Sequence, residues 1–276
     1  MKICGVVIWY NPGTDELNNI KTYIDDVDKL FIIDNSNKNN LSMLDYIECD
    51  KNKIEYISNM DNLGIAKALN IGCNMAINLG YKWVLTMDQD SKFPKLMASN
   101  YIENAIQKLK QDSNIAIFGL KISDNEHEEQ GYVDRVITSG NLLNLDAYTN
   151  VGGFDNELFI DEVDHDLSFK IIQHGYNIYK FNDVKLDHKI GNTKSFRILN
   201  MNFLTMNHNY IRKYYIVRNR FIMRDRYANY TQSYLRLNIV DFIKVILVED
   251  DKIRKMKYMI KGYLDYKKGK LGKINI

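Results

Sequence analysis

Cysteine and proline are scarce in this sequence. Its 276 residues include three cysteines and two prolines. Cys4, Cys49 and Cys73 lie far apart and form no C-x-x-C pair, which argues against a disulfide framework or a zinc site and fits a reducing compartment. Because only two prolines and 15 glycines are present, there is no room for a long disordered linker.

Long apolar runs and the common cofactor motifs are also missing. No apolar run has the length of a transmembrane helix, and no basic leader precedes the apolar segment Ile3–Tyr10, so we expect neither a membrane span nor a signal peptide. The first strand-like segment is not followed by G-x-G-x-x-G, which leaves a nicotinamide or flavin site unsupported. The chain also contains no P-loop, no H-E-x-x-H and no G-x-S-x-G motif.

Charge is unevenly distributed along the chain. The net charge is only +2, but residues 1–184 hold 16 basic and 28 acidic residues, a net −12, whereas residues 185–276 hold 21 basic and 7 acidic residues, a net +14. The basic tail is also rich in Tyr, Phe, Ile and Leu, and such a tail suits a polyanionic partner, either anionic lipid or nucleic acid. The alternative is that the tail forms solvated helical faces that offset an acidic body.

Short apolar segments that end in polar residues are the main structural signal. Val6–Tyr10, Leu30–Ile33 and Lys82–Met87 are apolar almost throughout, as buried parallel strands are, and a helix predicted over 15–28 separates the first two. Further strands are predicted at 54–57, 115–118, 132–138, 177–181 and 184–186, and further helices over roughly 62–80, 95–110, 145–150 and 208–268. The alternation of strands and helices predicts a doubly wound α/β sheet, and a hydrophobic content of 45% can fill its core.

Two carboxylates follow the third of these strands. Because side chains alternate along a strand, Asp88 and Asp90 start on the same side, at the carboxyl end where open α/β sheets bind ligands. Paired carboxylates there would hold a hard divalent cation, and the cation would hold phosphates. The alternative is that they begin a surface turn.

The helix before this strand has a polar entrance. Asn62 and Gly64 stand where free backbone N–H groups favour an anion. Gly72, inside the helix, costs about 1 kcal/mol relative to alanine, so we expect it to permit close packing on the sheet.

A second acidic cluster heads a helix predicted to end at Gly175. Asp161, Glu162, Asp164 and Asp166 place four acids in six positions. The helix macrodipole favours each acid in the first turn by roughly 0.3–1 kcal/mol, but mutual repulsion among four should cost more. The cluster therefore indicates chemistry or a nearby cation.

Seven short motifs occur in a fixed order over residues 1–195. They are Tyr10–Pro12, Ile33–Ser36, Asn62–Gly64, Met87–Asp90, Gly152–Asp155, Phe159–Asp166 and His188. In this order they resemble the GT-A-fold glycosyltransferases of family two, and among them the bacterial rhamnosyltransferase-like branch. The tail matches less specifically, through Tyr214-Tyr215 and Arg218-Asn219.

The resemblance implies a GT-A fold, which is a Rossmann-like, mixed but mostly parallel α/β sheet flanked by helices, with a C-terminal helical extension. Residues 1–200 would form the nucleotide-sugar-binding and catalytic domain and residues 201–276 a basic amphipathic helical region. The implied reaction is the inverting transfer of a sugar to a glycan, or to a glycan linked to polyprenyl diphosphate, during cell-surface polysaccharide synthesis. The favoured donor is dTDP-L-rhamnose, with UDP-sugars behind it.

The resemblance also implies residue roles. Nucleotide-sugar binding would fall to Tyr10, Asn11, Asp34, Asn35, Asn62, Gly64, Lys67 and Asp88, and ligation of Mg²⁺ or Mn²⁺ on the diphosphate to Asp88, Asp90 and His188. Asp164 occupies the position of the catalytic base, with Asp161 and Asp166 as further candidates. Where the branch has a Glu-Trp pair this chain has Asp166-Leu167, which leaves open the acceptor and the division of work between Asp164 and Asp166.

Two other functions stay open at this stage. A nucleotidyltransferase that makes nucleotide sugars would share the sheet and the acidic site, but it should carry a phosphate loop rich in glycine and arginine where this chain has Asn11-Pro12-Gly13. A non-catalytic module that binds nucleotide or membrane would not need the carboxylates at positions 88, 90 and 164.

The basic tail suggests where the enzyme is located and what it binds. We expect a cytoplasmic enzyme, peripheral at the inner face of the cell membrane, whose tail binds anionic lipid and not nucleic acid. A homodimer formed through the same helices is the alternative.

Overall fold

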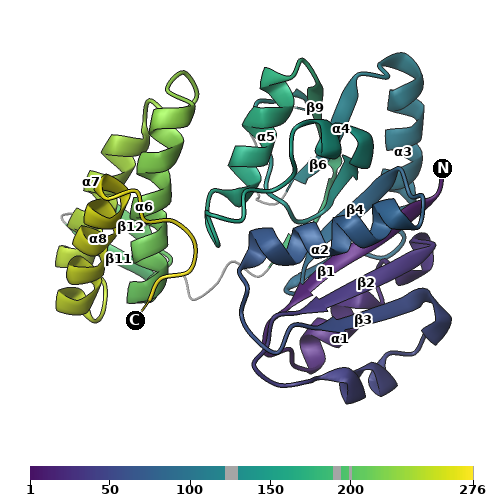
Figure 1. The fold of residues 1–276 in the computed structure, drawn as a ribbon, viewed down its shortest axis with the longest axis horizontal. Coiled ribbons are helices and arrows are strands. Elements are labelled where there is room, and N and C mark those ends of the chain that lie inside the picture. The colour runs from purple at the N-terminus through teal and green to yellow at the C-terminus, as the bar shows by residue number, and fades with distance from the viewer. Residues whose placement is uncertain (122–129, 189–193, 199–200, 276) are drawn as a thin grey trace. The chain divides into compact units, whose positions relative to one another are not determined.

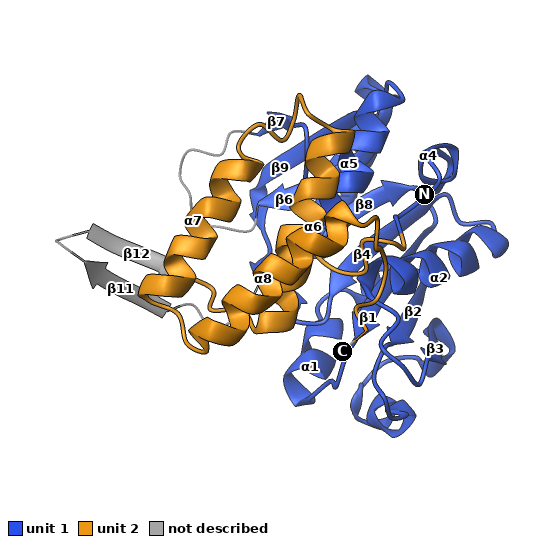
Figure 2. Ribbon diagram, turned by 60° about the vertical axis from the view of Figure 1, so that its left-hand side comes forward, with its two compact units in different colours: residues 1–155, 164–188 blue, residues 156–163, 189–276 orange. Residues whose placement is uncertain are grey.

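The computed structural model describes residues 1–121, 130–188, 194–198 and 201–275 (Figure 1). The chain forms two compact units, coloured blue and orange in Figure 2. Unit 1 comprises Met1–Asp155 and Asp164–His188, and unit 2 comprises Asn156–Val163 and Lys189–Ile276. The short segment Asn156–Val163, which contains the first five residues of the Phe159–Asp166 motif, therefore belongs with the C-terminal helices.

Unit 1 is built on an eight-stranded sheet with the order β3-β2-β1-β4-β8-β6-β9-β7. The strands are β1 (Ile3–Trp9), β2 (Lys29–Asp34), β3 (Ile54–Ser58), β4 (Trp83–Asp88), β6 (Ile115–Lys121), β7 (Gly131–Tyr132), β8 (Asn141–Asn144) and β9 (Asn177–Lys185). β3, β2, β1 and β4 run parallel, and β6 and β9 pair in parallel, whereas β8 is antiparallel to both β4 and β6 and β7 is antiparallel to β9. This is the expected mixed, mostly parallel sheet.

Helices cover both faces of this sheet. They are α1 (Thr14–Ile20), α2 (Ile65–Asn78), α3 (Met97–Gln111), α4 (Leu145–Asn150) and α5 (Val163–Gln173), with 3₁₀ turns at Ile24–Asp26, Leu41–Tyr46 and Lys51–Lys53. Val7 of β1 belongs to the core cluster that also contains residues of α1 and α3. Its neighbour Val6 meets α2 on the other face, where a Cβ added at Gly72 would lie 2.5 Å from a Val6 methyl group. The expectation that Gly72 permits close helix–sheet packing is thus confirmed.

Unit 2 is a bundle of α6 (Tyr210–Arg226), α7 (Tyr234–Leu247) and α8 (Lys252–Lys267) with a hairpin of β11 (Lys194–Ile198) and β12 (Met201–Thr205). The three helices pack on one another through a small core around Val217, Val245 and Met259. A second cluster joins Phe159 to Tyr214, Tyr215 and Ile274. In the parts of the chain that the structure describes, no helix is long and apolar enough to cross a membrane.

Three local predictions are wrong. The helix expected over 15–28 ends at Ile20, where the Thr22 hydroxyl donates to the Asn19 carbonyl oxygen and so competes with the helical bonding pattern. The strand expected at 132–138 stops after Tyr132, and the Val136 N–H donates to Ser168 Oγ instead of to a neighbouring strand.

The third concerns the second acidic motif. The helix starts at Val163, and Phe159, Asp161 and Glu162 lie in a loop with φ values of +66°, +64° and +65°. Asp161 and Glu162 therefore do not sit in a helical first turn.

Candidate active site

The carboxyl ends of β2, β1 and β4 meet at one edge of unit 1. In the parallel register Trp9 pairs with Asp34 and Ile8 pairs with Asp88, so Tyr10, Asp34 and Asp88 leave their strands side by side. β1 is the strand at which the connections change direction, since the chain goes outward to β2 and β3 and then returns to β4 on the other side. This is a topological switch point, where open α/β sheets bind ligands.

Asp34 is fully buried and accepts hydrogen bonds from three donors. Its Oδ1 accepts from the Ser36 N–H at 2.8 Å, and its Oδ2 accepts from Asn40 Nδ2 at 2.8 Å and from the Tyr56 hydroxyl at 2.6 Å. Burial and the hydrogen bond to Asp34 raise the pKa of Tyr56. The Asp34 carboxylate thus stabilises the conformation of the loop after β2. Tyr10, which follows β1, differs from it in being 46% exposed.

Asn35 ties the next loop to this edge. Its side-chain amide donates to the Gly64 carbonyl oxygen at 3.0 Å and its Oδ1 accepts from Asn59 Nδ2 at 2.8 Å. Gly64 adopts φ +86°, accepts from the Ala68 N–H and stands at the N-terminus of α2, with its own N–H bonded to Asn62 Oδ1. The predicted anion-binding entrance of α2 is therefore joined to the end of β2, and Lys67 lies exposed in the first turn of that helix.

The residue between the two aspartates of the Asp88-Gln89-Asp90 motif has a positioning role that the sequence reasoning missed. Gln89 Oε1 accepts from the Tyr10 N–H at 2.7 Å and Gln89 Nε2 donates to the Tyr10 carbonyl oxygen at 3.2 Å. The Gln89 carbonyl oxygen in turn accepts from Asn19 Nδ2. The ends of β1 and β4 are therefore tied together through one side-chain amide.

Asp88, Asp90 and His188 were the expected metal ligands. Asp88 is the last residue of β4, with its N–H bonded to Ser139 Oγ at 3.1 Å, and Asp90 lies in the following turn, both half-buried. Burial, and after it the charge of Asp88, raise the pKa of Tyr23.

His188 belongs to β10 (Asp187–His188), which pairs antiparallel with β5 (Ser91–Lys92) so that His188 lies opposite Ser91, the residue after Asp90. The His188 side chain lies outside the described part of the chain. Among the residues that are described, no three His, Cys, Asp or Glu gather as a metal site.

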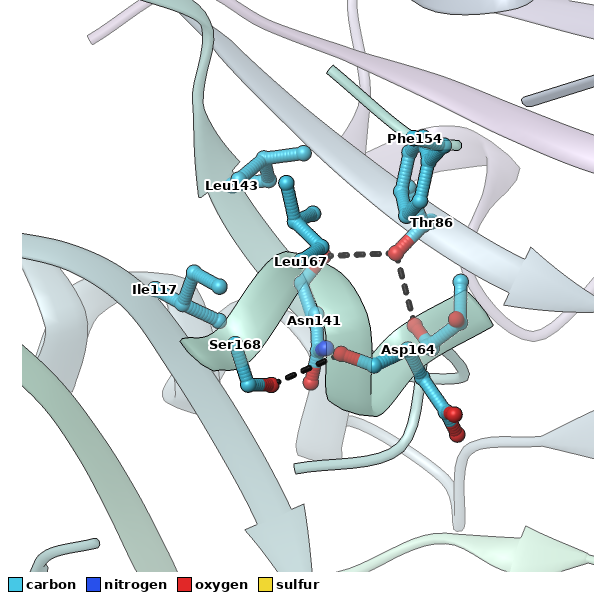
Figure 3. Close-up of a pocket in the computed structure, with 9 residues that line it drawn as sticks. Thr86, Ile117, Asn141, Leu143, Phe154, Asp164, Leu167 and Ser168 are labelled. Carbon is cyan, nitrogen blue, oxygen red and sulfur yellow. Dashed lines mark hydrogen bonds between the residues drawn. The ribbon is translucent and has the colours of Figure 1, made fainter. Parts of the chain in front are cut away.

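Asp164 lies in the first turn of α5 beside a very small cavity. The cavity has a volume of ≈ 10 Å³ and is lined by Thr86, Ile117, Thr138, Asn141, Leu143, Phe154, Asp164, Leu167 and Ser168 (Figure 3). It has room for about one water molecule and not for a sugar. The Asp164 carboxylate points away from Ile117 and Leu143, and its Oδ1 accepts from the His165 N–H at 2.9 Å.

Asp166 differs from Asp164 although both head the same helix. Asp166 is fully buried and its Oδ2 lies 2.7 Å from Lys170 Nζ, one turn along α5. Lys170 Nζ also donates to the Gly153 carbonyl oxygen, so this ion pair ties α5 to the Gly152-Gly153-Phe154-Asp155 motif.

The same motif is held from a second side by Asn70 of α2. Asn70 Nδ2 donates to the Phe154 carbonyl oxygen at 2.8 Å, and its Oδ1 accepts from the Phe154 N–H and from the Tyr148 hydroxyl. Gly153, with φ +69°, leaves space for Tyr148, whose ring would lie 2.8 Å from an added Cβ. A polar residue next to the apolar stripe of α2 was the signal that could have pointed to Asn70.

Asp161 and Glu162 belong to unit 2 and are bonded to its helices. Asp161 Oδ1 accepts from Arg212 Nε at 3.1 Å and from its terminal nitrogen at 3.0 Å. Glu162 lies 3.8 Å from Arg220 Nε and accepts from the Tyr234 hydroxyl at 2.6 Å. The third candidate base, Asp161, is thus engaged by a cation.

Two buried residues of α6 hold the loop that carries these acids. Arg218 donates to the carbonyl oxygens of Glu157 and Leu158, and Asn219 Nδ2 lies within 3.0 Å of the carbonyl oxygens of Leu158, Ile160 and Asp161. Both side chains are fully buried. In the sequence the Arg218-Asn219 pair was noted only as a less specific part of the family resemblance, and its role in holding this loop by backbone hydrogen bonds was missed.

Comparison with known proteins agrees with this geometry. A family model described as glycosyl transferase family 2 matches residues 15–170. The dTDP-rhamnosyl transferase RfbF of Shigella flexneri is 30% identical over 294 residues, an alignment that covers 98% of this chain and 97% of that protein.

Solved structures share the fold at low sequence identity. GalNAc-T7 with UDP, GalNAc and Mn²⁺ superposes with a TM-score of 0.62 at 12% identity, over 97% of this chain and 56% of that one, so this chain spans little more than half of GalNAc-T7. S. aureus TarS 1-349 in complex with UDP-GlcNAc gives a TM-score of 0.50 at 11% identity, over 96% and 72% of the two chains. The expected GT-A fold is confirmed, and the chain belongs to glycosyl transferase family 2, as a glycosyltransferase that depends on a nucleotide sugar.

Proposed function

We propose that this enzyme transfers L-rhamnose from dTDP-L-rhamnose to a glycan acceptor with inversion at the anomeric carbon. The observation that carries the choice of donor is the near full-length similarity to a dTDP-rhamnosyl transferase. A UDP-sugar is the second candidate donor, because a structural neighbour was solved with UDP-GlcNAc. The meeting of Tyr10, Asp34 and Asp88 at the switch point supports a nucleotide site there.

The nucleotide site is proposed to have two parts. Tyr10, Asn11, Asp34 and Asn35 would surround the base, with Asn11 fixed in a left-handed conformation, φ +48°, by the bond from its N–H to Ser36 Oγ. Because Asp34 already accepts hydrogen bonds from three donors, we assign it two roles, which are to stabilise the shape of this pocket and to contact the base directly. The second part, Asn62, Gly64 and Lys67 at the N-terminus of α2, suits the negative charge of the diphosphate or its sugar.

Asp88 and Asp90 fit a hard divalent cation, Mg²⁺ or Mn²⁺. Two carboxylates supply oxygen ligands, diphosphate oxygens can supply others, and the backbone register brings His188 next to the residue after Asp90. A neighbour with the same fold was solved with Mn²⁺ and UDP. When bound, such an ion would offset the charge that develops on the departing diphosphate.

We propose Asp164 as the general base. Its carboxylate would take the proton from the acceptor hydroxyl while that oxygen bonds to the anomeric carbon and the bond from this carbon to the diphosphate breaks. Asp166 and Asp161 are weaker candidates, because Asp166 is fully buried against Lys170 and Asp161 is paired with Arg212.

We further propose a division of labour along the chain. Residues 1–200 would bind the donor and carry out transfer, and residues 201–276 would engage the acceptor and hold the enzyme at an anionic membrane surface. Exposed apolar side chains on α7 and α8 and the surplus of basic residues in this region support that assignment. A glycan linked to polyprenyl diphosphate would be the acceptor suited to such a location, and a homodimer through α7 and α8 is the competing account.

A nucleotide-binding screen tests the proposal directly. Thermal stabilisation would be measured with dTDP, UDP, GDP and ADP, each with and without Mn²⁺, followed by donor hydrolysis with dTDP-L-rhamnose, UDP-GlcNAc and UDP-galactose. We expect dTDP with Mn²⁺ to raise Tm most and dTDP-L-rhamnose to be hydrolysed fastest, with Asp90→Asn abolishing the effect of the metal. A preference for another nucleotide, or a dTDP effect that does not change with Mn²⁺ or in Asp90→Asn, would contradict the donor or the metal assignment respectively.

A further inference from the structure

Unit 2 contains a groove that the proposed transfer site does not use. It is lined by Phe221 and Arg224 of α6, Leu235 of α7, and Tyr263, Tyr266 and Lys267 of α8. Its volume of ≈ 420 Å³ falls within the range of roughly 300–1,000 Å³ that is usual for small-ligand sites. Because every lining residue comes from the three-helix bundle, the groove is complete within unit 2.

Three aromatic rings that line the groove lie against one another. Phe221 and Tyr266 are stacked, with ring centroids 5.2 Å apart and an interplanar angle of 21°, and the Tyr263 centroid lies 4.9 Å from that of Phe221. Tyr263 remains 39% exposed. The faces of such rings carry partial negative charge and attract the partly positive C–H bonds on the flat face of a pyranose.

Charged groups of both signs border these rings. The Arg224 guanidinium lies 5.8 Å from the Phe221 centroid, and the Lys267 ammonium lies 5.9 Å and 5.5 Å from the centroids of Tyr263 and Tyr266. The Tyr266 hydroxyl donates to Asp225 Oδ2 at 2.6 Å, which places a carboxylate beside the same ring. Donors and an acceptor around an aromatic platform suit a ligand rich in hydroxyl groups better than a hydrocarbon chain, which would not use them.

We propose that this groove binds sugar rings of the acceptor glycan, through residues other than those that carry out transfer. The inference rests on the proposed function for the nature of the acceptor and adds the place where its saccharide chain is held. Leu235, on the edge of the groove, also begins the row of exposed apolar side chains on α7. A glycan held here would therefore lie beside the helix face that we assign to the membrane.

The test uses the full chain and a synthetic α-L-rhamnotetraose, with binding measured by titration calorimetry. The informative variants are Tyr263→Ala, which removes a ring, and Tyr263→Phe, which keeps it. Leu264→Ala is the matched control, because Leu264 is the next residue of α8 and is 46% exposed but does not line the groove. Affinity for dTDP is measured on the same samples, and so are KM and kcat with the tetrasaccharide and with methyl α-L-rhamnoside as acceptors.

We expect Tyr263→Ala to bind the tetrasaccharide about ten-fold more weakly, which is typical for the loss of an aromatic anchor, while Tyr263→Phe and Leu264→Ala bind normally. In Tyr263→Ala, KM should rise for the tetrasaccharide and not for the monosaccharide, with kcat and dTDP binding unchanged.

Two results would overturn the proposed glycan site and leave the proposed function standing, provided that the protein still binds dTDP. One is absence of tetrasaccharide binding, and the other is binding by Tyr263→Ala as tight as that of the unmodified protein. Binding of dodecyl phosphate in the groove, without binding of the tetrasaccharide, would also overturn the glycan site, in favour of a lipid phosphate. Tetrasaccharide binding without dTDP binding would instead count against the proposed donor chemistry alone.

Discussion

At the scale of single residues, the aspartates of this enzyme differ mainly in how their carboxylates are satisfied. Asp34 is buried under three hydrogen-bond donors and Asp166 is buried against Lys170, so both stabilise the fold around the site. Asp164 is half-buried, and its Oδ1 accepts from the N–H of the following residue, His165. A base must be accessible to its substrate, and this contrast favours Asp164.

The first prediction separates these roles. Asp164→Asn should lower turnover by about 10²–10⁴, the usual contribution of general-base catalysis, and leave dTDP-sugar binding and Tm nearly unchanged. Asp166→Asn should instead lower the free energy of unfolding by about 1–3 kcal/mol, because it weakens a buried ion pair whose lysine is partly exposed. Steady-state kinetics and urea unfolding of both variants decide the matter. Full turnover in Asp164→Asn would move the role of the base to Asp166 or Asp161.

The second prediction concerns His208, which is partly buried beside the α6 N-terminus. Burial, and then the charges of Arg212 and Lys213, lower its pKa from 6.5 to about 4, against weaker opposing effects of Glu249 and Asp241. Between these values the unfolded chain binds a proton that the folded chain does not, so stability should be complete above pH 6.5 and should fall as pH drops toward 4. The slope is at most about 1.4 kcal/mol per pH unit, and less because the ring is partly exposed.

Unfolding free energies measured from pH 7.5 to 4.5 would reveal this slope, and His208→Gln should flatten it. Glu249 should affect stability over a different pH range. Although burial opposes it, hydrogen bonds from Lys213, Thr205 and Lys255 lower the pKa of Glu249, so its contribution is lost only below about pH 4.5. An unchanged slope between pH 6.5 and 4.5 in His208→Gln would show that another group titrates there.

At the scale of elements, the loop Asn156–Val163 is the most constrained segment of unit 2. Three of its non-glycine residues have positive φ, a conformation that costs on the order of 1–3 kcal/mol each and persists only where surrounding contacts enforce it. α6 supplies those contacts through Arg218 and Asn219, and the segment leads directly into the first turn of α5 at Asp164. The pair therefore acts as a positioning device for the acidic loop.

The third prediction tests this clamp. Asn219→Ala removes the side-chain amide donor of the partly buried carbonyl oxygens of Ile160 and Asp161 and one of two side-chain donors to that of Leu158, and it should lower the free energy of unfolding by about 1–3 kcal/mol. Arg224→Ala, an exposed change on the same helix, should cost less than about 0.5 kcal/mol. Denaturant titration of the two variants checks this. Equal stability would mean that the loop keeps its conformation without Asn219.

How far these elements can be predicted depends on the range of the interactions that shape them. β1, β2 and β4 follow from their own apolar runs, and the polar residues after them lie at the ligand-binding edge because parallel strands share a direction. The conformation of 159–162 could not be predicted, since it is imposed by side chains about 60 positions later. The bonds of Gln89 to Tyr10 and of Asn70 to Phe154, which span 79 and 84 positions, are hidden from a local pattern for the same reason.

At the scale of the whole molecule, charge and apolar exposure coincide in the C-terminal region. Residues 185–276 carry a net charge of +14, from 21 basic and 7 acidic residues. The same region exposes large apolar side chains on two adjacent helices, including Leu235, Ile239 and Ile243 of α7 and Ile253 and Ile260 of α8. Basic residues near an anionic leaflet contribute about 1 kcal/mol each, and apolar burial adds to this, so such a surface can attach reversibly without a spanning helix.

The fourth prediction is that this surface binds anionic membranes. Co-sedimentation should show binding to vesicles of phosphatidylglycerol and phosphatidylcholine, none to phosphatidylcholine alone, and weaker binding as salt rises. A double variant, Ile239→Glu with Ile243→Glu, should abolish binding, whereas Leu79→Glu, at an equally exposed leucine of unit 1, should not. Point changes are preferable to truncation, because Gly272 and Ile274 bond to Arg218 and Tyr215 inside unit 2.

Dimerisation through α7 and α8 is the alternative to membrane binding, and it predicts a different behaviour of the same surface. If α7 and α8 form a subunit interface, the apolar side chains are covered in solution, and light scattering will report a dimer that the double variant converts to a monomer. Failure of the folded protein to bind anionic vesicles at low salt, together with such a dimer, would replace membrane attachment by self-association. Binding by a monomer would exclude it, because the apolar rows of α7 and α8 would then have no partner other than the lipid.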